Sequence, residues 1–352
     1  MTKKRYLFYI SQNYSYAILR PLQKIIQERG DEASWLLVGN EVSDKFLKPT
    51  EHQLMTIEEA IEWQPQAVFV PGNVVPRFIP GVKVGVFHGF DTGKGDSITR
   101  SSHFSIRHCF DLYCTQGPDF TLPFQRLAKK HGTFKVVETG WSTLDPLFSG
   151  NDTQSAADKV DNRPVVLFCS TFSTLFSCAP LIFDQIKAMS KKGNWRWLVQ
   201  FHPKMNKEIV EKYKALANEN LTFVETDNVI PLLKEADVML CDTSSVLIMF
   251  LLQGKPVVTF KNKSKKPHLI NVNEVDEIEP ALERALSNPK ALREEIDSYC
   301  NRIHPMRDGH SAERVLAAAD DLIENGLIGL KRKPLNLLRR FKMRRSLNYW
   351  KF

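Results

Sequence analysis

Short apolar runs alternate with segments whose apolar residues recur every three or four positions over the first 148 residues. The runs predict buried strands, and the periodic segments predict amphipathic helices. Strands separated by helices are typical of βαβ units with a parallel sheet. The expected strands are 6–10, 34–38, 67–70, 82–87, 111–115 and 135–138, and the expected helices are 16–29 and 57–63.

A polar stretch at residues 149–163, rich in Ser, Asn, Asp, Gln and Thr, interrupts this pattern and predicts an interdomain linker. A second alternating set follows. Its expected strands are 165–169, 197–201, 221–224, 238–241 and 257–260, and its expected helices are 180–192, 207–217, 229–235, 244–253, 277–286, 290–301 and 311–324. The pattern predicts an α/β fold with two Rossmann-like lobes, 1–148 and 164–326, facing a cleft and followed by a tail, 327–352.

Composition changes this picture only at the tail. The 352 residues are 43% hydrophobic and 25% charged, which excludes a disordered, collagenous or disulfide-stapled chain. The net charge is +8, but nine of the 48 basic residues lie after residue 329, where there is no Asp or Glu. The rest of the chain carries 39 basic and 40 acidic residues, a net of −1. A near-neutral globule with a basic tail argues against an extended nucleic-acid face.

The cysteines and the apolar runs indicate in which cellular compartment the protein works. The six cysteines have no paired spacing, which favours buried thiols in a reducing cytosol over a metal or disulfide framework. Lys3, Lys4 and Arg5 resemble the start of a signal peptide, but the apolar run after them is too short. The longest apolar run, 246–252, is far shorter than the ~20 residues of a membrane span. A cytoplasmic protein without a spanning helix is expected.

Two histidines come directly after predicted strands, where parallel α/β sheets bind ligands. His88 precedes Gly89 in a glycine-rich loop and is a candidate general base, although a histidine that orders a polar loop fits as well. His202 precedes Pro203 and Lys204 in the second lobe, and a surface histidine is the plain alternative.

Hydroxyl groups gather at a third strand end. The segment Asp242-Thr243-Ser244-Ser245 opens an apolar helix and suits a phosphate, although an ordinary helix cap needs one such residue. Ser170 and Thr171 follow another strand and are weaker candidates for the same phosphates.

Further candidates fit a helix cap as well as a substrate contact: Asp145, five residues after Gly140, and the pair Asp308 and Arg314. The chain has no HExxH, DxD or paired Cys/His spacing, so no metal or other cofactor is expected. GxGxxG, P-loop and GxSxG motifs are absent too.

Taken in order, these pieces resemble the CDP-glycerol glycerophosphotransferase family of teichoic acid and capsule synthesis. The matching pieces are His88-Gly89, Gly140-x-x-x-x-Asp145, His202-Pro203, Asp242-Thr243-Ser244-Ser245-Val246 with Gly254-Lys255-Pro256, and Asp308-Gly309 with Arg314. The resemblance implies a GT-B fold and a CDP-linked polyol phosphate donor, most simply CDP-glycerol. A hydroxyl of a cell-surface glycan or glycolipid would attack the β-phosphorus, and CMP would leave.

The resemblance also implies roles. His88 would deprotonate the acceptor in the N-terminal lobe, and His202 would stabilise charge on the donor phosphates in the C-terminal lobe. Thr243, Ser244 and Ser245 would hold the pyrophosphate, with Lys204 nearby. After the His-Gly pair these enzymes usually continue Thr-Pro-Leu-Lys, whereas this chain has Phe90 to Asp96, in which Lys94 is the candidate replacement.

Two other functions stay open. A UDP-N-acetylglucosamine 2-epimerase or another GT-B glycosyltransferase shares the Gly-x-x-x-x-Asp and His-Pro elements, but those epimerases carry Ser-Gly-Gly where this chain has Thr243-Ser244-Ser245. A non-catalytic scaffold that keeps the fold is the third reading.

The tail interleaves its nine cations with apolar residues and ends in Tyr349, Trp350 and Phe352. Leu337, Leu338 and Phe341 share a helical face, so the segment resembles an amphipathic anchor on an anionic membrane. A disordered tail and a nucleic-acid patch are the alternatives. The membrane reading predicts a peripheral protein on the inner face of the cell membrane.

Overall fold

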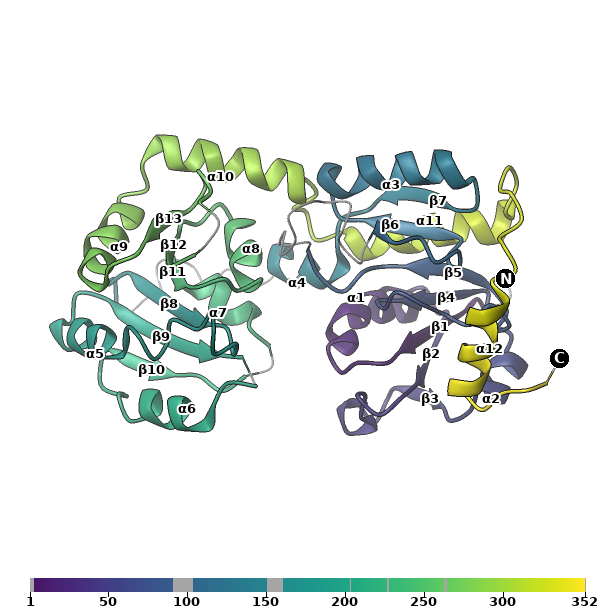
Figure 1. Cartoon of the computed structure of the whole chain (residues 1–352), viewed down its shortest axis with the longest axis horizontal. Coiled ribbons are helices and arrows are strands. Elements are labelled where there is room, and N and C mark those ends of the chain that lie inside the picture. The colour runs from purple at the N-terminus through teal and green to yellow at the C-terminus, as the bar shows by residue number, and fades with distance from the viewer. Residues whose placement is uncertain are drawn as a thin grey trace. The chain divides into compact units, whose positions relative to one another are not determined.

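The computed structural model describes residues 3–90, 104–150, 161–202, 204–226, 228–262 and 265–351. The chain forms two compact units (Figure 1). Unit 1 consists of residues 1–148 together with 303–352, and unit 2 consists of residues 149–302. The predicted α/β fold with two Rossmann-like halves is confirmed.

Unit 1 is built on a seven-stranded sheet in the order β3-β2-β1-β4-β5-β6-β7, and every strand pairs in parallel with its neighbours. The strands are β1 (Arg5–Ile10), β2 (Glu32–Leu37), β3 (His52–Leu54), β4 (Ala67–Val70), β5 (Val82–Gly85), β6 (Leu112–Thr115) and β7 (Lys135–Glu138). The helices are α1 (Ser15–Glu28), α2 (Ile57–Glu62), α3 (Pro118–His131), α4 (Asp145–Phe148), α11 (Ser311–Asn325) and α12 (Leu337–Ser346). In such a sheet the carboxyl ends of all strands lie along one edge, so the loops after them share that edge.

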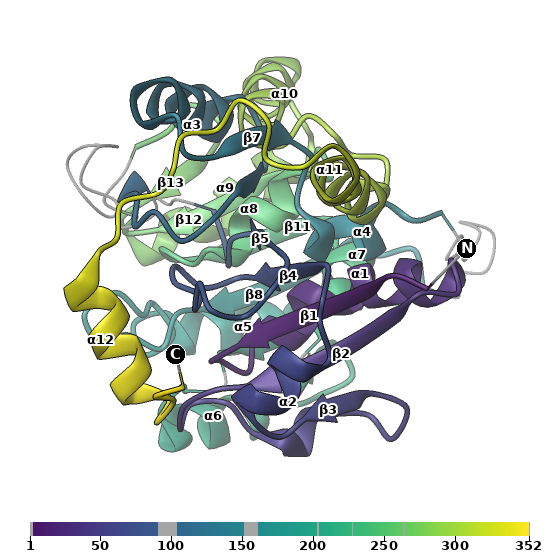
Figure 2. The same cartoon turned by 90° about the vertical axis from the view of Figure 1, so that its right-hand side faces the viewer.

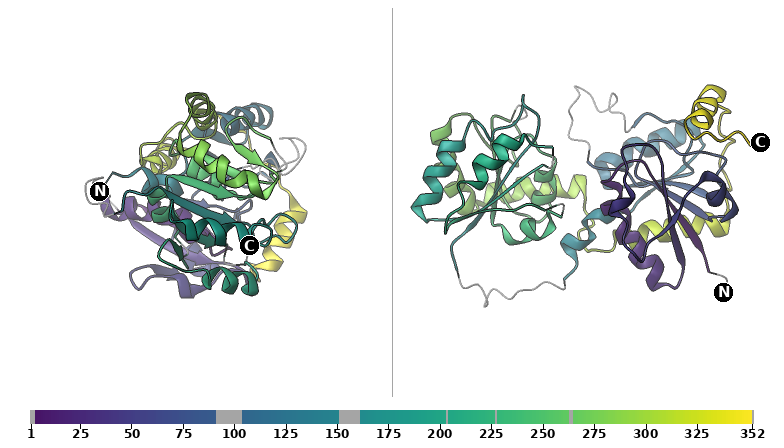
Figure 3. Two further views of the ribbon diagram at one scale, coloured as in Figure 1. Left: turned by 90° about the vertical axis from the view of Figure 1, so that its left-hand side faces the viewer. Right: turned by 90° about the horizontal axis from the view of Figure 1, so that it is seen from below.

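Unit 2 repeats this architecture with a six-stranded parallel sheet in the order β10-β9-β8-β11-β12-β13, seen from two further sides in Figure 3. The strands are β8 (Val165–Ser170), β9 (Arg196–Phe201), β10 (Leu221–Phe223), β11 (Val238–Cys241), β12 (Val257–Phe260) and β13 (Ile270–Val272). The helices are α5 (Phe183–Lys192), α6 (Lys207–Lys214), α7 (Ile230–Glu235), α8 (Val246–Leu251), α9 (Ile278–Leu286) and α10 (Lys290–Ile303). Strands β8 and β11 are fully buried, as their unbroken apolar runs predicted.

The predicted end of the second lobe is wrong. That lobe was expected to reach residue 326, but the chain returns to unit 1 at Ile303. Helix α11 packs beside α1, β5 and β6, and the backbone N–H groups of Ser311 and Ala312 donate to the Asp145 carboxylate at 2.9 and 2.7 Å. These contacts attach the last regular helix to the first sheet.

The tail is likewise part of unit 1 rather than a separate segment. Figure 2 shows it running from α11 past β7 to α12. The Lys331 N–H donates to the Gly132 carbonyl at 2.7 Å, and the Tyr349 ring stacks on Phe78 at 4.8 Å. The Arg344 guanidinium lies 4.8 Å from the Phe78 ring centroid, where its charge faces the π cloud. The described part of the tail is therefore folded onto unit 1, and its helix is α12.

The sequence-based prediction also missed four of these helices and strands: β3, β13, α3 and α4. Strands β3 and β13 have three residues each and helix α4 has four, too few for a recognisable period. Helix α3 begins at Pro118, where the missing N–H costs little, and contains Pro123 in its interior, where a proline is unfavourable and obscures the helical signal.

Candidate functional site

His88 lies just beyond the carboxyl end of β5. Phe87 has a φ of 59°, a left-handed conformation that turns the chain sharply before the histidine. The His88 ring places Nδ1 3.1 Å from the Pro71 carbonyl oxygen, and the Tyr14 ring lies 5.7 Å away. A carbonyl oxygen can only accept, so Nδ1 carries the proton and a neutral His88 has its lone pair on Nε2. That tautomer suits a general base.

The loop after His88 is attached to the neighbouring strand. The Gln116 side-chain amide, just beyond β6, donates to the Gly89 carbonyl at 3.0 Å. The Phe90 ring meets the Trp141 ring edge-on at 5.3 Å. Gly89 is thus held by its backbone, while Lys94 lies outside the described residues.

His202, at the carboxyl end of β9, has the opposite tautomer. Its Nδ1 accepts from the Lys204 backbone N–H at 3.0 Å, so the neutral ring carries its proton on Nε2. The Phe172 ring lies 4.5 Å from it, on the loop after β8. Partial burial and then the Lys204 charge lower the pKa of His202, which favours the neutral ring near pH 7. His202 is therefore a hydrogen-bond donor suited to phosphate oxygens.

Asp242 differs from its expected role. The side chain is buried, and it accepts from Ser170 Oγ at 2.5 Å and from the backbone N–H groups of Thr171 and Cys178 at 3.1 Å. Ser170 Oγ also lies 2.9 Å from Ser177 Oγ. Burial raises the pKa of the Asp242 carboxyl, and these donors oppose the shift. Asp242 and Ser170 hold the 170–178 loop between adjacent strands β8 and β11, where the strand order reverses, and do not line a surface.

The next three residues are the more exposed ones. The hydroxyl residues at this strand end are Thr243 and Ser244, which are partly exposed, and Ser245, which is exposed. Ser245 precedes α8, and within the described part of the chain its side chain makes no capping hydrogen bond. Helix α8 has only six residues, so its dipole is short. Any anion held here depends on hydroxyl and backbone donors more than on the helix dipole.

Asp145, Asp308 and Arg314 form a structural cluster in unit 1. Asp145 is buried and accepts at the start of α11, and burial raises the pKa of its carboxyl. Arg314 donates to both Asp308 carboxylate oxygens at 2.8 Å and to the Thr139 carbonyl at 2.9 Å. The contacts expected for substrate are thus occupied by the protein itself, and they position α11 beside the end of β7.

The search of the sequence did not single out His304, which lies where the chain re-enters unit 1. It is fully buried, and its Nε2 accepts from the Trp141 N–H at 2.8 Å. Burial lowers the pKa of His304 to about 4, so the ring is neutral. The Phe148 ring stacks near it at 6.2 Å. No strand end marks this position in the sequence, so the search for strand-end side chains passed over it.

None of the helices in the described residues is both long and apolar enough to cross a bilayer. Within the same residues, no three or more His, Cys, Asp or Glu side chains come together as a metal-binding group. All six cysteines are buried thiols.

Comparison with known proteins adds a family. Residues 128–319, more than half of the chain, match the family described as CDP-glycerol:poly(glycerophosphate) glycerophosphotransferase. No curated protein matches the sequence.

Solved structures share the fold. The wall teichoic acid polymerase TagF superposes with a TM-score of 0.67 at 13% identity, over 92% of this chain and 90% of that one. The S. aureus protein MnaA in its UDP co-structure gives 0.61 at 15% identity, over 95% and 100% of the two chains. A UDP-N-acetylglucosamine 2-epimerase gives 0.60 at 16% identity, over 95% and 99%. At such identities the likeness shows the two-unit fold alone.

Proposed function

We propose an acceptor and residue roles for this chain, which belongs to the CDP-glycerol:poly(glycerophosphate) glycerophosphotransferase family. Enzymes of this kind transfer a polyol phosphate from a CDP-linked donor, and so does this chain. The proposed polyol is glycerol, and the proposed acceptor is a hydroxyl of a cell-surface glycan or glycolipid, as in teichoic acid or capsule synthesis.

In the proposed reaction the acceptor oxygen forms a bond to the β-phosphorus of CDP-glycerol. The bond from that phosphorus to the bridging oxygen breaks, and CMP leaves with the bridging oxygen. The acceptor proton passes to Nε2 of His88, and the resulting imidazolium is stabilised by the Pro71 carbonyl on Nδ1–H. The Nε2–H of His202 donates to the donor phosphates, with Thr243, Ser244 and Lys204 as further contacts. Positioning and charge stabilisation supply most of the catalysis in phosphoryl transfer.

One observation supports this division of labour above all: the two histidines have opposite tautomers. His88 Nδ1 faces an acceptor, which leaves a base on Nε2. His202 Nδ1 faces a donor, which leaves an N–H on Nε2. A base and a phosphate donor are the two different groups that the reaction needs.

The test measures CMP release from CDP-glycerol in the presence of a glycerol phosphate-primed acceptor. His88→Asn should lower kcat by about 10²–10⁴, as loss of a general base does. His202→Ala should lower kcat by about 10²–10³, as loss of a charge-stabilising donor does. His52→Asn, a change at an exposed histidine of β3, is the matched control and should leave the rate unchanged. Full activity in His88→Asn would overturn the proposed base.

Donor choice separates this function from its nearest rival. Because the fold is similar to that of UDP-N-acetylglucosamine 2-epimerases, an enzyme acting on a UDP-sugar is the alternative. A ligand that binds the native state raises its melting temperature. We expect CDP and CMP to stabilise the protein and UDP and GDP to do so far less. Selective stabilisation by UDP, with turnover of UDP-N-acetylglucosamine, would favour the rival.

We also propose that the protein acts on the inner face of the cell membrane, in contact with anionic lipid. Exposed apolar side chains and cations alternate on the tail. Leu337, Leu338 and Phe341 are 66, 81 and 54% exposed, and Arg345 lies beside them on α12. Apolar side chains among cations favour an anionic interface.

Point variants test the membrane proposal better than truncation, because Tyr349 belongs to the core of unit 1. Leu338→Ser with Phe341→Ser should weaken co-sedimentation with vesicles of phosphatidylglycerol and phosphatidylcholine. Leu122→Ser, at a 54% exposed leucine of α3, is the matched control. Unchanged vesicle binding in the double variant would refute the role of α12.

A further inference from the structure

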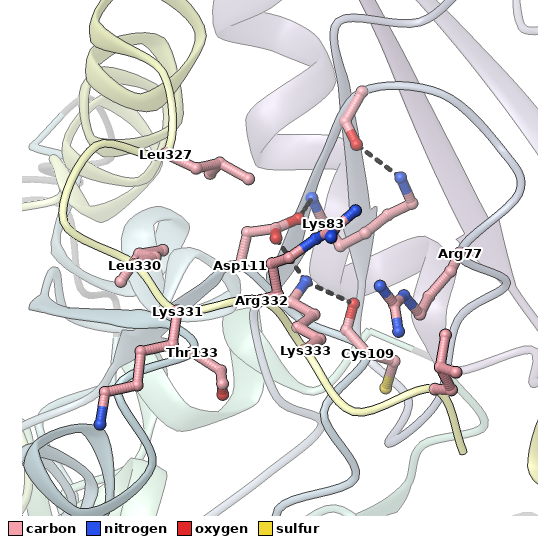
Figure 4. A pocket seen from close by; sticks show the side chains of 12 residues that line it. Arg77, Lys83, Cys109, Asp111, Thr133, Leu327, Leu330, Lys331, Arg332 and Lys333 are labelled. Atoms are coloured by element: carbon pink, nitrogen blue, oxygen red, sulfur yellow. Dashed lines mark hydrogen bonds and ion pairs between the residues drawn. The ribbon is translucent and has the colours of Figure 1, made fainter.

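A pocket of about 710 Å³ lies in unit 1 between the sheet and the start of the tail. Its floor comes from the amino ends of β5 and β6, with Gly81, Lys83 and Asp111, and from Thr133 just before β7. Its outer wall is the tail from Leu327 to Leu335 (Figure 4). The pocket therefore exists only while the tail is docked.

The lining is strongly basic. Five cationic residues and one carboxylate surround the pocket: Arg77, Lys83, Lys331, Arg332 and Lys333 against Asp111. The Asp111 carboxylate pairs with the Lys333 ammonium and accepts from the Lys83 backbone N–H at 2.8 Å. These two contacts stand at the centre of Figure 4. One carboxylate offsets one cation and leaves a clear excess of positive charge.

The remaining cations meet neutral groups. The Lys83 ammonium donates to the Gly81 carbonyl, and Arg77 donates to the Pro334 carbonyl at 2.8 Å. Among the described residues, the side chains of Lys331 and Arg332 make no hydrogen bond or ion pair. Carbonyl oxygens solvate a cation but do not neutralise it, so the excess charge persists.

Burial makes this excess costly. The side chains of Lys333 and Asp111 are only 10 and 8% exposed, and Lys83 is 5% exposed. Burial lowers the pKa of Lys83 to about 8. The Asp111 carboxylate opposes this shift, and the charges of Lys333 and Arg77 add to it. Lys83 is still mostly protonated at neutral pH, in a place that disfavours a further cation. An anion in the pocket would relieve that repulsion.

The residues that line the pocket indicate which kind of anion it binds. Guanidinium and ammonium groups bind phosphate through charge-assisted hydrogen bonds, and the Thr133 hydroxyl offers a further polar contact. The lining contains no aromatic ring that a nucleobase would stack on. Exposed apolar residues stand at the tail side of the pocket: Leu327 is 44% and Leu335 is 63% exposed. A phosphate ester with a small polar head fits, and an acyl chain could leave along these leucines.

The pocket is separate from the residues assigned to catalysis in unit 1. Lys83 is the second residue of β5, whereas His88 follows the other end of that strand. The strand continues from Lys83 to Gly85, and the chain then turns at Phe87 before His88, so the two side chains lie at opposite ends of β5. The same division holds for β6, with Asp111 before it and Gln116 after it. The pocket thus opens at the opposite edge of the sheet from His88.

We propose that this pocket binds the phosphate of a glycerol phosphate-type ester, either a phospholipid head group or a free phosphate ester, between Arg332 and Lys331 on the tail and Lys83 on the sheet. The inference goes beyond the transfer reaction, because it concerns a second anion site whose occupancy fastens the tail to unit 1.

The experiment uses the full chain and the double variant Lys331→Gln with Arg332→Gln. Lys129→Gln with Lys130→Gln is the matched control, since it removes the same charge from exposed positions of α3 that do not line the pocket and do not belong to the tail. Binding is measured with glycerol 3-phosphate by calorimetry, with CMP at saturation to occupy the donor site. It is measured in parallel by co-sedimentation with phosphatidylglycerol vesicles.

A site predicts about a tenfold or greater loss of affinity for the pocket variant and less than about threefold for the control. Loss in the calorimetric arm identifies a free phosphate ester, and loss in the vesicle arm alone identifies a lipid head group. Equal losses for both variants would mean diffuse attraction and would overturn the site. No binding of either probe by the wild type would overturn it too. CMP release by the pocket variant, with a soluble acceptor, should stay at the wild-type rate, so failure here is distinct from failure of the proposed function.

Discussion

Replacing Gly140 with alanine should destabilise unit 1 far more than the same change at another left-handed glycine. Gly140 has a φ of +77°, and a Cβ there would lie 2.4 Å from Ser311 Oγ, 3.1 Å from His304 Nε2 and 3.2 Å from Ser311 Cβ. Gly30 has nearly the same φ, +76°, with nothing within 4 Å of its Cβ. The two positions differ in crowding and not in backbone conformation.

The expected magnitude follows from three contributions. A left-handed alanine costs about 1 kcal/mol, and overpacking of a rigid contact costs about 1–3 kcal/mol. Pushing His304 away weakens the hydrogen bond from the Trp141 N–H, which is worth about 1 kcal/mol. Gly140→Ala should therefore cost about 3–5 kcal/mol and Gly30→Ala about 1 kcal/mol. For a unit of this size, the first corresponds to a loss of roughly 10 °C in melting temperature.

Differential scanning calorimetry measures both variants, and Gly30→Ala identifies the transition of unit 1. Adding Ser311→Ala removes the closest atom, so the double variant with Gly140→Ala should recover part of the loss. Equal shifts for Gly140→Ala and Gly30→Ala would refute the steric reasoning. The affinity for CMP should not change, because the Gly140-x-x-x-x-Asp145 motif holds α11 and does not touch the residues assigned to the donor.

Three further predictions concern acid, the donor loop and metal. His304 stays neutral in the fold with a pKa of about 4, against about 6.5 when unfolded, so its contribution is complete above pH 6.5 and is lost as the pH falls towards 4. Unit 1 should lose roughly 2 kcal/mol by pH 5, and His304→Gln should flatten this slope in calorimetry, while His268 maintains the slope of unit 2. Asp242→Ala leaves three donors without their acceptor, so amide hydrogen exchange in residues 170–178 should become at least about tenfold faster. Asp237→Ala is the control: it loses one hydrogen bond from the Val165 N–H at the other edge of the sheet and should leave exchange in residues 170–178 unchanged. The sequence has no metal-binding motif, so EDTA should leave the rate of CMP release within about twofold, and a Mg²⁺-dependent recovery after chelation would contradict this.

The strands and the positions of the two histidines could be predicted because each central strand is an unbroken apolar run with a polar residue directly after it. Such a run is buried on both faces in a parallel sheet, so its end also marks the ligand edge. The residues His88, His202 and Asp242 were found by this rule. The rule locates a residue at a strand end but does not say what its side chain contacts. For that reason Asp242 was assigned to phosphate, whereas its carboxylate holds the 170–178 loop.

The return of the chain to unit 1 could not be predicted from periodicity. An amphipathic helix shows one apolar face whichever sheet covers it, so residues 311–325 fit either unit. The choice depends on Asp145, which accepts from Ser311 across 166 positions of sequence. The tautomers of His88 and His202 could not be predicted either. They depend on the Pro71 carbonyl and the Lys204 N–H, which the sequence does not place beside the two rings.

The charge of the tail has a different meaning once its residues are placed. Of its nine cations, Lys333 is nearly buried against Asp111, and Arg344 is buried between Phe78 and Tyr349. Lys331 and Arg332 line the basic pocket, which leaves five for α12 and the end of the chain. An anchor made of nine diffuse charges would lose affinity evenly as any of them is removed, in proportion to the roughly 1 kcal/mol that each contributes near an anionic leaflet. The folded tail predicts unequal losses instead: instability at Lys333 and Arg344, loss of one bound phosphate at Lys331 and Arg332, and gradual weakening only along α12.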